Sequence, residues 1–306
     1  MAGRGTGVSP LVVPSAEVRD ALMAGRPVVA LETSVLSQGL PMPRNVEAVE
    51  RMSAAIRDAG ALPAWIGVVA GEVRVGLSDA ELERFCDPEG IAKVARRDLP
   101  MALAGGVLGA TTVSTTIWAA HAAGIAIGAT GGIGGVHAEA GDVSADLLEL
   151  ARTPVLLVCS GPKSIVDPVA THERLEELGV AVVGYGVDRL PFFLAREAPV
   201  ELEHRADTPA EAAAIARAQR ALGVRSAVLL CNPVPRSHEM DAITVAEAVR
   251  RGEARAGREG VRGKAVTPFL LSALAEETAG VSLEANLALL ASNAGLAAGV
   301  AVALAG

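Results

Sequence analysis

Short runs of apolar residues alternate with longer amphipathic segments along this chain. Uninterrupted runs of Val, Ile and Leu are typical of strands in a parallel sheet that is buried on both faces. Six runs predict strands: Pro27–Leu31, Ala64–Val69, Gly124–Ala129, Pro154–Cys159, Val180–Tyr185 and Ser226–Cys231. Because these runs alternate with helical patterns, the sequence predicts an α/β fold, with three α/β/α layers around a central, mostly parallel sheet. We expect a single domain over residues 1–306.

Apolar spacing and capping residues predict the helices between these strands. The segment Arg44–Gly60 places its apolar residues on one face of a helix. Asp167-Pro168 is typical of an N-cap followed by proline in the first turn, and Thr208-Pro209-Ala210-Glu211 is typical of a capping box with the same proline. These signals predict the helices Arg44–Gly60, Asp167–Gly179 and Thr208–Gly223.

Two further segments of the second half differ sharply in polarity. Ser282–Leu304 is long and mostly apolar, and predicts a well-buried helix. Arg250–Lys264 is charged and rich in glycine, and predicts a solvated loop.

Composition excludes several classes of function. The chain is 51% hydrophobic and 20% charged, which is ample for a large core. Its net charge of -8 argues against a nucleic-acid partner, since such partners select basic proteins. Aromatic residues make up only 2%, so no base-stacking platform is expected. Composition therefore argues against a function in nucleic-acid binding.

Cysteine usage and apolar run lengths indicate a reducing, cytoplasmic setting. The three cysteines are few and far apart, which fits neither a disulfide framework nor a CxxC metal site. Cys159 and Cys231 each end an apolar run and are predicted to be buried thiols. No signal peptide is recognisable at the N-terminus. Apolar stretches are interrupted before about 18 residues, so no membrane span is expected.

Polar residues stand where the predicted strands end. Glu32 follows the first strand, Thr130 the third, and Asn232 the last. Ser160 and Lys163 follow Pro154–Cys159. Parallel α/β sheets bind ligands at the carboxyl ends of their strands, so these residues predict a site at that edge.

The segment GATGGIGGVH, Gly128 to His137, is the densest glycine segment of the chain. Glycines let backbone N–H groups approach an anion such as phosphate. The dinucleotide fingerprint GxGxxG fails, because His137 occupies the place of its third glycine. A tight turn without a ligand and a structural His137 remain open alternatives.

Lys163 stands in SGPKS, in a chain that carries most of its positive charge as arginine. A P-loop is rejected, because Pro162 occupies the place of the glycine before the lysine. One interpretation is a surface lysine just before a helix. The other is a lysine in an apolar pocket, which loses its proton more readily and attacks a carbonyl-like carbon.

Three further candidates also have two interpretations each. The segment Asp142–Asp146 either caps a helix or binds a hard cation or sugar hydroxyls. Glu32 either serves a turn or is a general acid with a raised pKa. Lys93 either belongs to a solvated cluster, KVARRDLP, or binds phosphate.

Ten motifs in order resemble one family over nearly the whole chain. The motifs are ALETS (Ala30–Ser34), GLPMPRN (Gly39–Asn45), KVARRDLP (Lys93–Pro100), GATTVSTT (Gly109–Thr116), ATGGIGGVH (Ala129–His137), DVSADLLELA (Asp142–Ala151), GPKSIVD (Gly161–Asp167), NPVP (Asn232–Pro235), GKAVTPFLL (Gly263–Leu271) and SLEANLALL (Ser282–Leu290). Together they resemble the family of pseudouridine-5'-phosphate glycosidase, related to the indigoidine synthase A proteins.

This resemblance implies a homotrimeric α/β enzyme with one Mn²⁺ per subunit. The family reversibly breaks the carbon–carbon glycosidic bond of pseudouridine 5'-phosphate, giving uracil and ribose 5-phosphate. In this reaction the base leaves from a carbon atom. An ordinary glycosidase with two carboxylates would therefore have no good leaving group to expel. The resemblance implies that Lys163 forms a Schiff base with C1' of the sugar.

The resemblance also assigns the other site residues. Glu32 matches the proton donor and Asp142 the metal ligand. The positions that match substrate contacts are Lys93, Val113, Ser144, Ala145 and Asp146, with His137 and Asn286 near the base and Thr130 at the phosphate. The sequence departs from the family pattern at Thr33-Ser34, at Ser37-Gln38 and at Pro162.

Two rival functions remain open on the sequence. One is a paralogue of pigment biosynthesis that acts on another ribosyl phosphate. The other is a non-catalytic protein that binds a sugar phosphate, for which a retained Glu32 and Lys163 would have no use.

Overall fold

The polypeptide folds around one sheet whose strands are short and mostly buried. The structure is a computed structural model that describes residues 11–137 and 142–306; the expectation that the N-terminus carries no signal peptide concerns residues that lie outside these ranges. In the described residues the sheet has 11 strands. They are β1 Val12–Pro14, β2 Val28–Glu32, β3 Leu62–Val69, β4 Glu72–Val75, β5 Ala92–Val94, β6 Gly109–Thr111, β7 Ile127–Ala129, β8 Leu156–Cys159, β9 Ala181–Tyr185, β10 His204–Ala206 and β11 Val228–Cys231.

The strand order is β1-β4-β3-β2-β7-β8-β11-β9-β10, with β6 pairing β3 and β5. The run from β2 through β7, β8, β11 and β9 to β10 is parallel, and antiparallel pairing occurs where β3 meets β4 and β6. The prediction of a mostly parallel sheet is therefore confirmed. Each of the six predicted runs overlaps a strand. The third begins only at Ile127, because Gly124 takes a left-handed conformation that ends the preceding helix.

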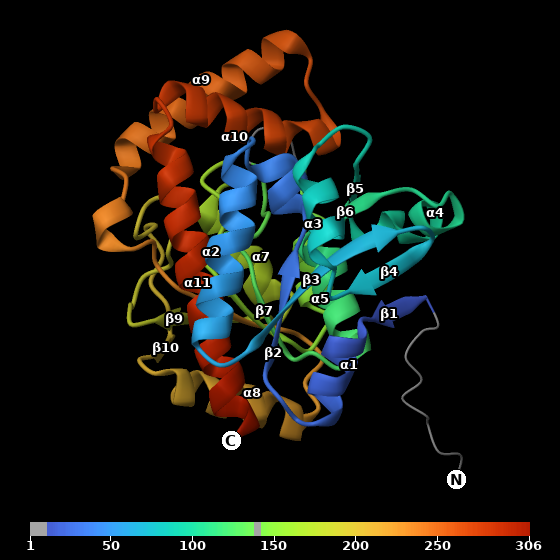
Figure 1. Ribbon diagram of the computed structural model, residues 1–306. Coiled ribbons are helices and arrows are strands. Elements are labelled where there is room, and N and C mark those ends of the chain that lie inside the picture. The colour runs from blue at the N-terminus through green and yellow to red at the C-terminus, as the bar shows by residue number, and fades with distance from the viewer. Residues whose placement is uncertain (1–10, 138–141) are drawn as a thin grey trace.

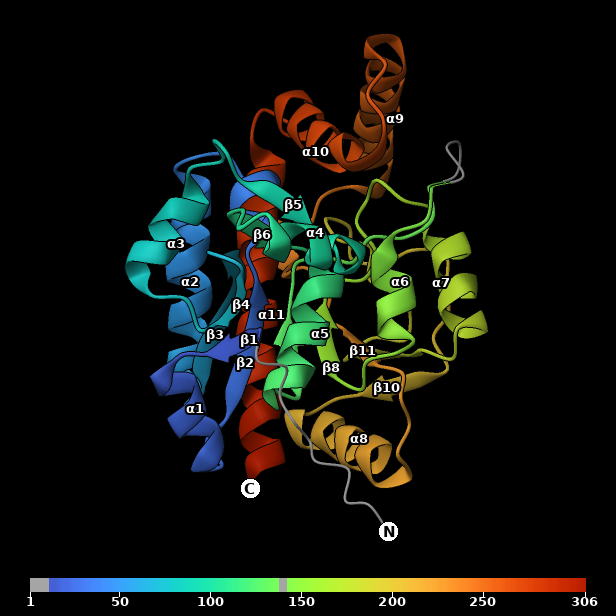
Figure 2. The ribbon, with the colours of Figure 1, turned by 90° about the vertical axis from the view of Figure 1, so that its right-hand side faces the viewer.

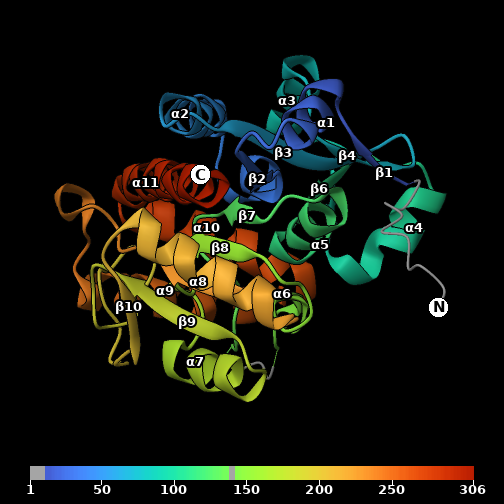
Figure 3. The same cartoon turned by 90° about the horizontal axis from the view of Figure 1, so that it is seen from below.

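Helices cover the two faces of the sheet (Figure 3). The described helices are α1 Ala16–Met23, α2 Arg44–Asp58, α3 Asp79–Cys86, α4 Leu99–Ala104, α5 Val113–Ala123, α6 Ala145–Leu150, α7 Pro168–Glu177, α8 Pro209–Leu222, α9 Ala242–Glu259, α10 Val266–Glu277 and α11 Val281–Ala305. Alternate strand residues face opposite layers. In β8, Leu156 and Val158 belong to the core under α2, α8 and α11, whereas Leu157 and Cys159 belong to the core under α5, α6 and α7.

The three capped or amphipathic helices expected from the sequence are present as α2, α7 and α8. Asp167 caps α7 through the N–H groups of Val169 and Ala170, and Thr208 accepts from the N–H of Glu211 at α8. Cys159 and Cys231 are fully buried free thiols, as expected.

The solvated loop expected at Arg250–Lys264 is wrong, because α9 continues to Glu259. Although the segment contains glycines and charged residues, one face of α9 is buried against α10. This face is called the stripe. The stripe is Val245, Ala248, Val249, Gly252 and Ala256. A Cβ on Gly252 would lie 3.3 Å from both Ala273 and Leu270, so this glycine lets the two helices approach closely. The α9–α10 pair stands above the edge at which the parallel strands end (Figures 1 and 2).

Helix α11 is long and apolar enough, by length and composition, to cross a membrane, with a mean hydropathy of 1.9. Glu284, Gly295 and Gly299 interrupt the apolar stretch, as expected, but these interruptions do not exclude the helix by this measure. The same window is 56% buried inside the protein, where α11 packs beside α2 and over β7 and β8 (Figure 1). Its apolar character is explained by this place in the core.

Candidate functional site

The predicted site residues lie together at the carboxyl edge of the sheet. Because β2, β7, β8 and β11 are neighbours, the residues that follow them meet at one place. A pocket of about 1230 Å³, counted out to its open mouth, lies there. Its lining includes all of the residues that the family resemblance assigns: Glu32, Lys93, Val113, Thr130, His137, Asp142, Ser144, Ala145, Asp146, Lys163 and Asn286. Ser160 and Asn232, also predicted from the strand ends, are not among its lining residues.

Glu32 lies at the end of β2 with its side chain buried, at 6% exposure. Two hydroxyls hold its carboxylate. Thr130 donates to Oε1, and Ser34 donates to Oε2. Since Thr130 has a single hydroxyl proton, its donor faces Glu32 in this structure. The two hydrogen bonds fix the orientation of the carboxylate at the wall of the pocket.

The glycine loop after β7 is clamped by Asp146. The backbone N–H groups of Ser114 and Gly134 each donate to one carboxylate oxygen, both at 3.0 Å. Ser144 caps α6 by accepting from the N–H of Asp146, which confirms the capping interpretation for Ser144. A Cβ on Gly134 would lie 2.3 Å from Ser144 Oγ. Glycine is therefore required for this loop to lie against α6.

Lys163 is held against the same loop. Its backbone N–H donates to the carbonyl of Ile133 at 2.9 Å, and the N–H of Ile133 donates to the carbonyl of Gly161 at 3.1 Å. Gly161 has φ +75°, and a Cβ there would lie 1.9 Å from the carbonyl oxygen of Pro191. Lys163 is partly buried and lines the pocket, so the interpretation as a surface lysine is not supported.

Lys93 is the middle residue of the short strand β5 and also lines the pocket. Burial lowers the pKa of Lys93, and the positive charge of Lys163 acts in the same direction. The carboxylates of Asp146 and Glu32 oppose this shift. Lys93 is therefore desolvated beside a second cation, a position in which an anionic ligand is favoured.

His137 and Asn286 lie at further points of the lining. Burial lowers the pKa of His137, and the nearby carboxylate of Asp142 opposes the shift. Asn286, on α11, is 6% exposed, and its Oδ1 has no hydrogen-bond partner among the described residues. A buried acceptor without a partner is costly, so this oxygen is available for an N–H donor of a ligand.

Asn293 was not singled out from the sequence, yet it joins three strand ends. It is fully buried on α11. Its Nδ2 donates to the carbonyls of Thr130 and Gly131, at 2.9 and 3.3 Å, and to Ser160 Oγ at 3.1 Å. Its Oδ1 accepts from Asn232 Nδ2 at 2.9 Å. One amide thus fixes the loops that carry Thr130 and, three residues after Ser160, Lys163.

We expect Asn293→Ala to lower the free energy of unfolding by about 2–4 kcal/mol, because it leaves several buried polar groups without partners. Denaturant unfolding measures this change. Ser292→Ala is the matched control on the same helix, since it removes only an acceptor 3.0 Å from Asn232 Nδ2. Equal stability losses in the two variants would contradict the role given to Asn293.

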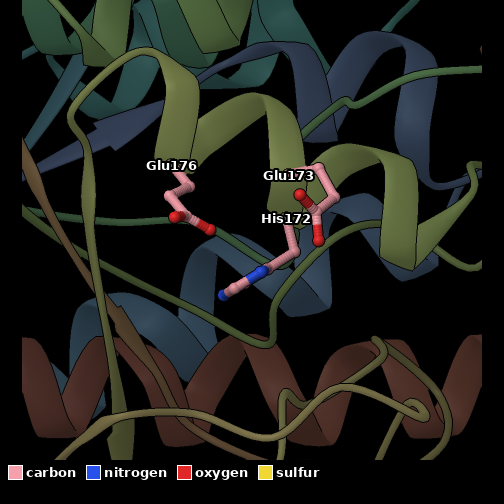
Figure 4. Close-up of side chains that lie close together, drawn as sticks. All are labelled: His172, Glu173 and Glu176. Carbon is pink, nitrogen blue, oxygen red and sulfur yellow. The ribbon is translucent and has the colours of Figure 1, made fainter.

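Two places offer ligands to a metal ion. Asp142 lines the pocket and brings a carboxylate, the ligand type that hard divalent cations prefer. A separate group, His172, Glu173 and Glu176, lies on α7 outside the pocket lining, with its possible ligand atoms within 4.8 Å of one another (Figure 4). Both of its glutamates are exposed.

The relatives of this chain among known proteins agree in their family or in their name. The sequence profile of the family described as "Indigoidine synthase A like protein" matches residues 17–303. A protein of Methylobacterium nodulans named pseudouridine-5'-phosphate glycosidase is 48% identical, over 97% of this chain and 89% of its own length. A protein of Salinispora tropica with the same name is 48% identical, over 94% of this chain and 90% of its own.

Solved structures agree with these relatives. The prealnumycin C-glycosynthase AlnA, in complex with ribulose 5-phosphate, is 40% identical with a TM-score of 0.88, covering 97% of this chain and 98% of its own. An indigoidine synthase A-like protein from Thermotoga maritima is 38% identical with a TM-score of 0.87, covering 92% of this chain and 94% of its own.

Proposed function

The chain belongs to the indigoidine synthase A-like family, and from this premise we propose that it reversibly cleaves pseudouridine 5'-phosphate into uracil and ribose 5-phosphate. The observation that carries the proposal is that Glu32 and Lys163 line one pocket, in a chain nearly half identical to proteins named for this activity. A direct assay tests it: purified protein with pseudouridine 5'-phosphate and Mn²⁺ should release uracil. Absence of uracil and of the reverse reaction would overturn it.

The proposed chemistry needs a nucleophile and a proton donor. The neutral amine of Lys163 attacks C1', and the C1'–O4' bond breaks as the ring oxygen takes a proton, with Glu32 as the donor. The ammonium formed at Lys163 Nζ by the attack returns a proton to Glu32, which then supplies it to C5 of the uracil ring. The nitrogen lone pair forms a C1'=N bond while the C1'–C5 electrons return to the ring. Water hydrolyses the imine, which frees ribose 5-phosphate and Lys163.

Other residues of the pocket bind and orient the substrate in this proposal. Lys93 binds the phosphate as a point charge. The amide of Asn286 faces the base, because its unpartnered Oδ1 suits a ring N–H of uracil. Thr130 and Ser34 hold Glu32 in the orientation required for proton transfer.

Asp142 fits a hard divalent cation and is the ligand that we propose for Mn²⁺. It offers one carboxylate at the pocket, and such cations keep several waters beside one or two carboxylates. When bound, the cation would supply positive charge for oxygen atoms of the substrate. The group on α7 is the competing location.

Activity is expected to disappear on chelation and to return with Mn²⁺. Asp142→Ala should weaken Mn²⁺ binding by at least about 10-fold, since the ligand is removed. Electron paramagnetic resonance of free Mn²⁺ measures binding without turnover. His172→Ala is the control for the α7 group and should bind as the wild type does. The reverse pattern would move the metal to α7.

A C-glycosynthase that builds a bond to another acceptor is the second candidate, because AlnA is 40% identical with the same fold. Product analysis separates the two: uracil release supports the first proposal, and transfer of the sugar phosphate to a different ring supports the second. For the assembly we propose a cytoplasmic homotrimer, as the family resemblance implies. Light scattering after size-exclusion chromatography tests the oligomeric state.

A further inference from the structure

The chain has three lysines among 27 lysines and arginines, and all three line the pocket. They are Lys93, Lys163 and Lys264. All the other residues in this count are arginines. Lysine is thus absent from the general surface of this protein and occurs only where a compact ammonium group can reach the site. Two of the three already have proposed roles, which leaves Lys264.

Lys264 reaches the pocket from the short turn Gly263–Ala265, directly before α10. Its Nζ donates to Asp98 Oδ2 at 2.5 Å and to the backbone carbonyl of Lys93 at 3.3 Å. The side chain is 45% exposed. An ammonium group has three donors, so these two bonds leave one N–H for a ligand.

Lys264 forms an ion pair with Asp98, and its positive charge also acts on the neighbouring Lys93. Burial is the main cause that lowers the pKa of Lys93, and the positive charge of Lys264 contributes in the same direction. The two ammonium groups therefore act on each other, and a shared anion would relieve the repulsion. A phosphate monoester carries a charge of about -1.5 to -2 at pH 7, which two lysines match.

We propose that Lys264 is a second phosphate-binding lysine, which together with Lys93 makes this pocket specific for phosphate monoesters. The identity of the substrate rests on the function proposed above, but the binding of a phosphate group does not. Arginine is a poorer choice at this place. Its planar guanidinium directs its donors as a fork, whereas the ammonium can meet a carboxylate, a carbonyl and a phosphate oxygen in three directions.

The test measures binding by isothermal titration calorimetry, with ribose 5-phosphate and inorganic phosphate as probes. Lys264→Ala should weaken both by about 10- to 100-fold, the usual effect of losing one charge-assisted hydrogen bond. Lys264→Arg should retain part of the affinity, because the charge remains. Arg262→Ala is the matched control: it removes the same charge two residues away, from an exposed side chain outside the pocket lining.

Several results would overturn this inference. They are wild-type affinity in Lys264→Ala, equal losses in Arg262→Ala, a Lys264→Arg variant as weak as Lys264→Ala, and a wild-type protein that binds neither probe. A wild type that binds ribose 5-phosphate but releases no uracil would sink the proposed activity instead. In that case the comparison of the variants still decides the role of Lys264.

Discussion

Lys163→Arg is expected to lower kcat by about 10⁴- to 10⁶-fold, as far as removal of the side chain in Lys163→Ala does. The guanidinium group stays protonated and cannot attack C1', although its charge and size are similar. The backbone of residue 163 is held by Ile133 and by the turn at Gly161, so both variants should remain folded. Stopped assays with pseudouridine 5'-phosphate measure the loss, and circular dichroism checks the fold.

Borohydride provides the covalent readout for Lys163. Reduction during turnover, or with ribose 5-phosphate alone, should add the mass of the sugar phosphate to one peptide. The chain has only three lysines, so the adduct has few possible places. Mapping to Lys163 supports the Schiff base. An adduct on Lys93 or Lys264, or turnover without any adduct, would refute it.

Glu32→Gln is expected to lower kcat by about 10²- to 10⁴-fold, the usual contribution of a positioned general acid. The amide has the same shape but cannot supply the proton that the ring oxygen or the uracil carbon takes. Substrate binding should change little. Steady-state kinetics with pseudouridine 5'-phosphate measure both parameters.

Glu149→Gln is the matched control for Glu32. Glu149 is also a buried glutamate, at 9% exposure, and accepts a hydrogen bond from the hydroxyl of Thr153 at 2.7 Å. It lies on α6 outside the pocket lining. Glu149→Gln therefore shows the effect of replacing a buried glutamate that does not belong to the site. If both glutamine variants lost activity equally, the loss would reflect stability and Glu32 would not be the proton donor.

The central strands could be predicted from the sequence because they are continuous apolar runs buried on both faces. The short strands β1, β5, β6 and β10 were not predicted. Each has three residues and forms only because a distant strand lies beside it, as when Lys93 pairs with Ala110. No local pattern carries that information.

The candidate site could be predicted from the strand ends and from the family resemblance. The roles of two residues, Asn293 and Lys264, could not. Asn293 looked like one polar residue in an apolar helix, and its four partners come from segments more than 50 residues away. Lys264 stood in a segment interpreted as a solvated loop. Its neighbours Asp98 and the carbonyl of Lys93 are brought to it only by the fold.

The position of α11 also bears on how the protein is made. During synthesis, Glu32, Lys93 and Lys163 leave the ribosome well before Val281, the first residue of α11. Until α11 is made, the faces of β7 and β8 that it covers stay open to water. The loops that follow these strands also lack the amide of Asn293, which joins them in the folded protein. The segment translated after all other helices therefore both closes the core and completes the pocket, so a chain that stops before residue 281 holds the nucleophile and the proton donor without the helix that aligns them.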